Sequence, residues 1–367
     1  MNADGLAARF ENPTAEELFG LALLLGVAVL CLDLVRRVAT GELAAARLLG
    51  LIWNGLVDSL YIALAAVGLS MTYSILRFAN FAHGDLLTTG AFSGWTVAYL
   101  IGGIGAADLG SRLLLDADGG AQAGDLGMDV LASPLAIVLG LIAAAVVTIA
   151  VSLAIDRLVY KRLRDADGIT LLIASVGIAL ALRYLIAFVY TQEARGIVAA
   201  APMWEPAWLP IGAINLHEAT LVGSGLTLIV GVHLMLQYTK LGTSMRAMSD
   251  NRDLAQVTGI STERVITATW AIGGGLAGVA GYLIVLDQSQ ITINLGWFLL
   301  LLVFSAVILG GIGSIYGALA GSLIIGTTIN ISLIWIPADL GNVAAFTLMI
   351  LVLVLKPDGL FGGVATT

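Results

Sequence analysis

Charged side chains are scarce in this 367-residue chain: Asp, Glu, Lys and Arg together make up 11% of it, while 59% of the residues are hydrophobic. A soluble fold of this length could not bury so much apolar surface, so a soluble globular protein is excluded. Lysine occurs only at Lys161, Lys240 and Lys356, and the formal net charge is −8. This charge balance does not suggest nucleic acid or other anionic partners.

Patterns that carry catalysis or metal binding are also missing. The single cysteine, Cys31, excludes an intrachain disulfide framework and is best explained as a small packing residue. The three histidines (His83, His217 and His233) lie on separate segments without ligand spacing, and no nucleophile elbow or phosphate-binding loop occurs. The chain is therefore not expected to be an enzyme or to hold a metal or cofactor. Any energy from ATP would have to come from another subunit.

Long apolar runs recur along the chain, and the mean hydropathy is +0.98. About 20 apolar residues cross a bilayer as a helix, and the runs lack the period-2 alternation of barrel strands. The sequence thus predicts an all-α polytopic transmembrane bundle in a cell (plasma or inner) membrane. The expected helices cover roughly residues 19–35, 51–76, 82–101, 131–156, 169–190, 218–238, 265–287, 296–310, 318–336 and 342–355.

Basic residues predict the orientation, because short Lys- and Arg-bearing loops stay on the cytoplasmic side. Such residues gather at 157–164 and again at 240–264, so both loops are expected inside, with Lys356 and the C-terminus. The acidic segments 108–129 and 192–218 are expected outside.

Upstream of Arg157, the number of expected membrane crossings does not agree with the sides predicted for the loops. Arg36, Arg37 and Arg47 suggest an inward loop, and a helix between residues 51 and 101 would then have to be broken, short or re-entrant. The alternative is an outward loop, against the charge rule. Residues 1–48 are interpreted as an N-terminal extension with one extra membrane helix, which is not a removable signal peptide.

A polar stretch, Arg77 to Gly94, interrupts the hydrophobic pattern with Arg, Asn, His and Asp. Ionisable groups are expensive at membrane depth, so this stretch is expected to line a feature buried in protein or filled with water. A second interruption, Leu309 to Gly317, gives a weak echo of the first and suggests two weakly related halves with discontinuous helices. Small residues at four-residue spacing, such as Gly274 and Gly278, are best explained as close helix packing.

The loop 240–264 encodes a short helix between two membrane spans. Asp250 or Asn251 can act as its N-cap, and Gly259 suits the position after its C-terminus. Because so short a helix would have marginal stability alone in water, we expect it to pack against a partner. An ordinary structured loop is the alternative.

At these residues the chain resembles the membrane permeases of ABC importers for branched-chain amino acids, of the LivH type. The resemblance covers about residues 50–363 and rests on four motifs in order. They are NFAHGD (80–85), the loop with Gly242, Arg246, Ala247, Ala255, Gly259 and Ile260, the run ILGGIGSIYGALAG (308–321), and KPDGLFG (356–362). A permease domain of residues 49–367 is expected.

The resemblance implies partners. A LivM-like second permease subunit would complete the pore, two cytoplasmic ATPase subunits would hydrolyse ATP, and an extracytoplasmic binding protein would deliver the amino acid. The loop helix would be the coupling helix that sits in a groove of the ATPase. Its candidate residues are Arg246, Asp250, Asn251, Ala255 and Gly259.

The interrupted regions are expected to line the pathway or its gate near the middle of the pore. The candidates are Asp58, Asn80, Phe81, His83, Gly84, Asp85, Gly310, Gly311, Gly313 and Ser314. Each polar candidate has a structural alternative. Asp58 could pair with a neighbouring helix, Asn80 or Asp85 could cap the helix near residue 82, and His83 could be a packing residue. Arg77 and Arg183 could snorkel to an interface.

Three functions remain open at this point. The first is an amino-acid ABC permease, and the second is a urea or short-amide permease of the same architecture. The third is a stand-alone ion-coupled transporter or channel, in which Asp58 and Asp85 would be the coupling carboxylates.

Overall fold

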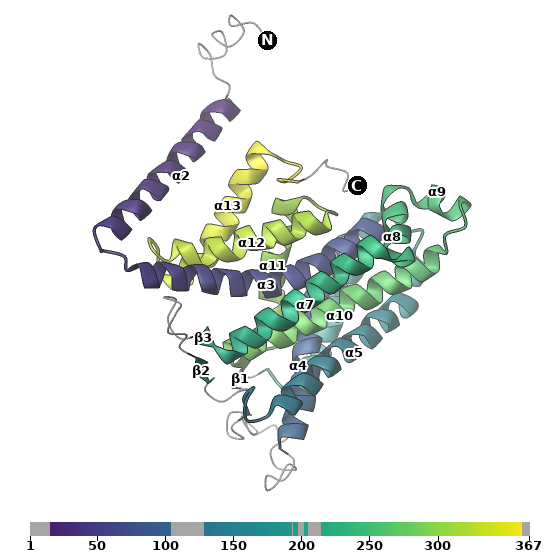
Figure 1. The fold of residues 1–367 in the computed structure, drawn as a ribbon. Helices are drawn as coiled ribbons and strands as arrows, with labels where there is room; N and C mark the ends of the chain where they lie inside the picture. The colour runs from purple at the N-terminus through teal and green to yellow at the C-terminus, as the bar shows by residue number, and fades with distance from the viewer. Residues whose placement is uncertain (1–14, 104–127, 193, 197–201, 205–213, 362–367) are drawn as a thin grey trace, which may run out of the picture.

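The computed structural model describes residues 15–103, 128–192, 194–196, 202–204 and 214–361. Residues 1–14 of the expected extension, and most of the acidic segments 108–129 and 192–218, lie outside the described residues. The described chain is a bundle of helices (Figure 1). The helices at the expected spans are α2 (Ala15–Ala39), α3 (Ala45–Leu76), α4 (Ala82–Gly102), α5 (Pro134–Leu158), α6 (Gly168–Tyr190), α7 (Leu216–Tyr238), α10 (Thr262–Gln288), α11 (Leu295–Gly310), α12 (Ile315–Ser332) and α13 (Gly341–Leu355).

The remaining elements are short and connect these helices. They are α8 (Lys240–Asp250), α9 (Arg252–Val257), the 3₁₀ turns η3 (Tyr160–Leu163) and η4 (Ala338–Leu340), and the two-residue strands β1 (Arg195–Gly196), β2 (Met203–Trp204), β3 (Ile214–Asn215) and β4 (Gln290–Ile291). Strand β1 pairs with β4 and β2 with β3, both antiparallel. Seven described segments are long and apolar enough to cross a membrane: α3, α5, α6, α7, α10, α12 and Ala338–Leu355. The predicted polytopic helical fold is confirmed.

The centre of the bundle is built where α3, α4 and α10 meet with very small residues between them. A Cβ on Gly90 of α4 would overlap the backbone of Gly278 of α10, and one on Gly281 would overlap the carbonyl of Leu87. The packing role expected for the small-residue face of α10 is confirmed. Because there is little hydrophobic driving force between helices in lipid, this close approach of backbones is a main source of packing energy.

One end of the bundle gathers both basic loops. Arg164, after α5, forms an ion pair with Glu263 at the start of α10, and Lys161 contacts the same carboxylate at 3.7 Å. The C-terminal segment returns to the end of α11, where the N–H of Leu360 donates to the carbonyl of Leu309. This end also carries α8 and α9 (Figure 1) and is called the α8–α9 end below. The prediction that these loops and the C-terminus share one side agrees with this arrangement.

The N-terminal basic segment lies at the opposite end. Helix α3 is continuous from Ala45 to Leu76, and its Trp53 donates a 2.6 Å hydrogen bond to Glu218 at the start of α7, far from α8. The expectation that this segment lies on the same side as the other basic loops, with a broken helix between, is therefore not met, and the arrangement agrees with the outward alternative. Arg36 forms ion pairs with Asp33 and Glu42, and Arg37 forms one with Asp33. Much of the positive charge of this segment is therefore neutralised by neighbouring carboxylates.

Each polar interruption contains the connection between two helices. Residues 77–81 connect α3 to α4 and residues 82–94 belong to α4, while residues 311–314 connect α11 to α12. Arg77 adopts a left-handed conformation and its guanidinium donates to the carbonyl of Ser249 in α8, while Gly313 lies beside α8. The two connections therefore lie towards the α8–α9 end.

Candidate coupling site and substrate pathway

The two short helices α8 and α9 form the loop between α7 and α10. The hydroxyl of Thr239 caps α8 by accepting from the backbone N–H three residues later at 3.1 Å. Asn251 caps α9 in the same way at 2.9 Å, and Gly259 follows α9 with a φ of 89°, as the sequence predicts. Asp250 is instead the last residue of α8, a helix that the sequence analysis did not anticipate.

Helix α9 projects from the bundle (Figure 1). It exposes apolar side chains. Leu254 is 61% exposed and Val257 is 86% exposed, whereas Ala255 between them is buried at 3%. Ala255 thus anchors the helix, and its neighbours form an outer surface with Arg252 and Asp253. An exposed apolar pair on so short a helix is the kind of surface that a protein partner covers.

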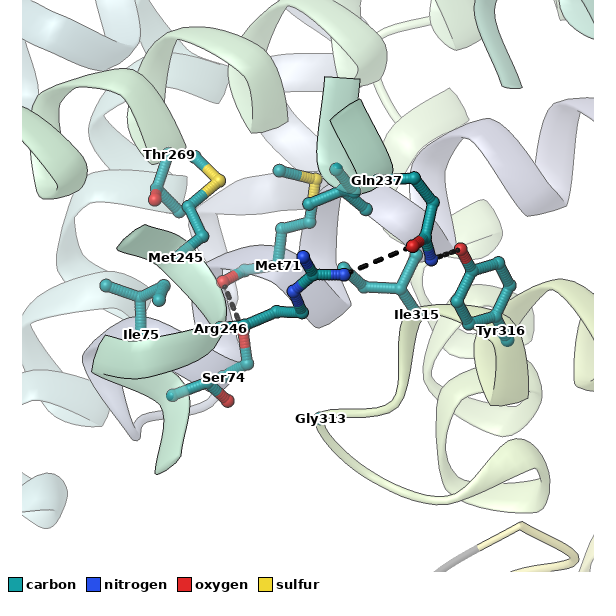
Figure 2. Close-up of a pocket in the computed structure, with 12 residues that line it drawn as sticks. Met71, Ser74, Ile75, Gln237, Met245, Arg246, Thr269, Gly313, Ile315 and Tyr316 are labelled. Carbon is teal, nitrogen blue, oxygen red and sulfur yellow. Dashed lines mark hydrogen bonds between the residues drawn. The ribbon is translucent and has the colours of Figure 1, made fainter. Parts of the chain in front are cut away.

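Arg246 lies on the inner side of α8. Its Nη1 donates to Oε1 of Gln237 on α7 at 3.2 Å, and Nε2 of Gln237 donates to the hydroxyl of Tyr316 on α12 at 2.9 Å (Figure 2). The same hydroxyl is 2.9 Å from Nδ1 of His233. This hydrogen-bond chain joins the loop 240–264 to the membrane helices α7 and α12. The periodicity of the sequence could not have indicated these contacts.

A cavity of about 70 Å³ adjoins this chain. It is lined by the end of α3 (Met71, Ser74 and Ile75), by α8 (Met245 and Arg246), by Thr269 of α10 and by the start of α12 (Figure 2). Because a water needs roughly 10–15 Å³ of such space, the cavity has room for a few waters. Five helices, α3, α7, α8, α10 and α12, meet around it.

Asn80 and Phe81 form the turn before α4. Oδ1 of Asn80 accepts from the N–H of Ala82, the first residue of α4, at 3.1 Å, although the N-cap position itself is Phe81. The phenol of Tyr160 donates to the same oxygen at 3.3 Å. Burial raises the pKa of Tyr160, so the phenol keeps its proton at neutral pH. The ring of Phe81 packs on Phe304 of α11 with centroids 5.1 Å apart.

His83 and Gly84 are buried against the bundle core. Nε2 of His83 is 2.9 Å from the carbonyl oxygen of Ala65 on α3, and the residue is 1% exposed. A Cβ on Gly84 would lie 2.6 Å from the carbonyl oxygen of Gly296, so α4 and α11 touch at their backbones. The His83 contact agrees with the packing alternative for that residue. A role of His83 or Gly84 in gating stays a prediction.

Asp85 forms a bidentate ion pair in the bundle interior. Its two oxygens accept from Nε and Nη2 of Arg183 on α6, each at 3.0 Å, and the guanidinium lies over the ring of Trp297 at 4.8 Å. The Asp85 side chain is 1% exposed and that of Arg183 is 13% exposed. Arg183 therefore binds inside the bundle rather than reaching for an interface, and Asp85 does not cap α4.

Asp58 lies at the opposite end from α8. It accepts from Nδ2 of Asn330 on α12 at 2.6 Å and from the phenol of Tyr61 at 2.8 Å. The alternative expected for Asp58, pairing with a neighbouring helix, is what its contacts show.

The second glycine-rich region shapes the turn between α11 and α12. Gly311 and Gly313 take positive φ values of 106° and 87°, which favour glycine, and the hydroxyl of Ser314 caps α12 by accepting from the N–H of Gly317 at 3.0 Å. The backbones of Gly310 and Gly317 touch across the turn. This region is brought together with Arg246 around the cavity, whereas Asp58 and Asp85 are far from it.

Comparison with known families shows where this architecture belongs. A family model described as the permease component of branched-chain amino acid transport systems matches residues 51–355. The chain belongs to this family. The matched residues begin after α2.

Named relatives agree with the family match. The chain is 28% identical to the high-affinity branched-chain amino acid transport permease LivH of Salmonella typhimurium over 84% of its own length and 94% of that protein. It is 26% identical to BraD of Pseudomonas aeruginosa with the same coverage, and 28% identical to a probable LivH of Methanocaldococcus jannaschii, covering 91% of that protein. No solved structure matches. This member of the permease family is a multi-pass membrane protein.

Proposed function

We propose that this chain is the transmembrane permease subunit of an ATP-driven importer for leucine, isoleucine and valine, and that it forms half of the translocation pathway. The family match over 51–355 and the names of the relatives support this function. They favour it over urea or short-amide transport, which none of these names mentions.

The observation that carries the proposal is helix α9. It is a capped, exposed helix between two membrane spans, and it presents Leu254 and Val257 outward. A groove on one of two cytoplasmic ATPase subunits would cover this pair. Arg246 would then pass movement of the loop to α7 and α12 through Gln237 and Tyr316.

The other subunits of the proposed importer follow from the same assignment. A LivM-like subunit would supply the other half of the pore, and an extracytoplasmic binding protein would deliver the substrate. Helix α2 would be an additional membrane helix: Nε1 of Trp335 donates to Asp33 at 2.9 Å, and Gly20 lies beside Leu355, so α2 follows α13 along its length.

A stand-alone ion-coupled transporter has less support. Its coupling carboxylates would be Asp58 and Asp85, but Asp85 is held by Arg183 and Asp58 by Asn330 and Tyr61. Neither carboxylate is left free to bind and release an ion.

The test is a pair of substitutions on α9, Leu254→Asp and Val257→Asp, in vesicles that contain the permease subunits, the ATPases and the binding protein. Burying such side chains contributes about 1.5–3 kcal/mol each, so we expect ATPase binding to weaken by roughly tenfold or more and leucine uptake to fall with it. Gln256→Ala, on another face of α9, is the matched control and should leave both unchanged. Normal ATPase binding by the double variant, or wild-type vesicles that import urea but no branched-chain amino acid, would contradict the proposal.

A further inference from the structure

Arg183 is a charged residue in the bundle interior whose presence packing alone does not explain. It lies roughly 22 Å from the start of α6 and roughly 10 Å from its end, which is within the hydrocarbon depth of a bilayer. A charge there is expensive unless it is paired or faces a polar space. Asp85 supplies the pairing, but only for part of the guanidinium.

The hydrogen bonds show which part is used. Asp85 occupies the edge formed by Nε and Nη2 of Arg183. A guanidinium has five N–H donors, and its second edge, Nη1 with the remaining hydrogen of Nη2, matches another carboxylate. Among the described residues, Nη1 of Arg183 has no hydrogen-bond acceptor within reach. The side chain of Asp85 is 1% exposed while that of Arg183 is 13% exposed, so only the arginine of the pair is partly uncovered.

The guanidinium lies against an aromatic ring inside an otherwise apolar bundle. Trp297 on α11 covers one of its faces, with the ring centroid 4.8 Å away. A single cationic fork beside an aromatic face fits a small molecule with one carboxylate and a hydrocarbon side chain.

We propose that Arg183 binds the α-carboxylate of the amino acid as it passes through the permease, with Asp85 as the residue that positions the fork. The inference rests on the proposed function and adds the group that would recognise the cargo. It also distinguishes amino acids from urea and simple amides, which carry no carboxylate.

The experiment must separate binding from the cost of a buried unpaired charge. The double variant Arg183→Gln/Asp85→Asn removes both charges and keeps polar side chains of similar shape, and Arg183→Lys keeps the charge without the fork. The control is Arg164→Gln/Asp156→Asn, a second buried Arg–Asp pair, beside η3, whose arginine also binds the exposed Glu263. All variants are compared in the assembled complex for thermal unfolding, ATPase activity, leucine uptake, and saturation-transfer NMR of leucine and leucinamide.

We expect both Arg183 variants to assemble and hydrolyse ATP, but to take up leucine roughly tenfold or more slowly, the scale of one lost charge-assisted hydrogen bond. The wild type should bind leucine better than leucinamide, and the double variant should not distinguish them. Full leucine uptake by the double variant, or equal binding of leucine and leucinamide by the wild type, would overturn the inference. Wild-type vesicles that import no branched-chain amino acid would instead refute the proposed function itself.

Discussion

Gly90 lies where α4 crosses α10, and its lack of a side chain lets the two backbones touch at Gly278. Replacing Gly90 with Ala should separate the helices, because neither backbone can yield as a flexible side chain would. Overpacking of this kind is expected to destabilise the bundle by about 1–3 kcal/mol. Thermal unfolding of the purified permease in detergent would show a lower transition temperature.

The control for Gly90 is Gly177 on α6, where a Cβ would meet nothing within 4 Å. Gly177→Ala should leave the transition unchanged or raise it, since alanine favours helix. An equal effect of the two substitutions would mean that the close approach of α4 and α10 contributes little to stability.

Asn80 shows how a single polar residue can serve a turn and a tertiary contact together. Its side chain accepts from the N–H of Ala82 at the start of α4 and from the phenol of Tyr160, which stacks on Trp270 with ring centroids 4.9 Å apart. The residue that was expected to line a pathway is thus held by hydrogen bonds to two segments. Its role in gating stays a prediction.

At the scale of elements, the hydroxyl of Tyr316 belongs to a hydrogen-bond chain that links the loop 240–264 to two membrane helices. Tyr316 on α12 accepts from Gln237 on α7 and contacts His233, and Gln237 in turn accepts from Arg246 on α8. If α8 transmits force through this chain, Tyr316→Phe should raise the ATP hydrolysed per leucine imported, by roughly two- to fivefold for the loss of about 0.5–1 kcal/mol of hydrogen bonding. The ratio is measured in vesicles with both activities recorded together.

The control is Tyr238→Phe, at the end of α7, where the side chain is 80% exposed. It removes a hydroxyl from the same end of the molecule without touching the chain from Arg246 to Tyr316, so coupling should not change. An unchanged ratio in Tyr316→Phe would mean that α8 moves α7 and α12 by packing alone.

At the scale of the whole molecule, the long helix α3 sets the topology. It connects the segment 36–47, at the end opposite α8, with Arg77, which contacts α8. In a Cys31→Ser background we expect Thr40→Cys to react with a membrane-impermeant maleimide added outside the cell. Asp165→Cys, in the loop before α6, should react only after the membrane is opened.

Both positions are suitable because Thr40 and Asp165 are exposed in the bundle. Labelling of both cysteines from the same side would contradict the arrangement of α2 and α3. If Asp165→Cys alone reacted from outside, the whole molecule would have the inverted orientation in the membrane. Helix α9 would then lie on the side away from any cytoplasmic ATPase.

Much of this protein could be predicted from local pattern. Apolar length fixed the existence of helices such as α5 and α10, because a backbone in lipid must satisfy its own hydrogen bonds. Capping chemistry at Asn251 and the turn at Gly259 located α9, since both depend on residues only a few positions apart.

Tertiary structure decided the contacts between residues far apart in sequence. The partner of Asp85 is Arg183, 98 positions away, and Arg246 reaches Tyr316 only through Gln237. Charge counting also misplaced the segment 36–47, because the rule sums basic residues and takes no account of α3 running unbroken through the bundle. Which groups meet inside the membrane depends on how whole helices cross, and a periodic pattern along one helix carries no information about the side chain that faces it from another.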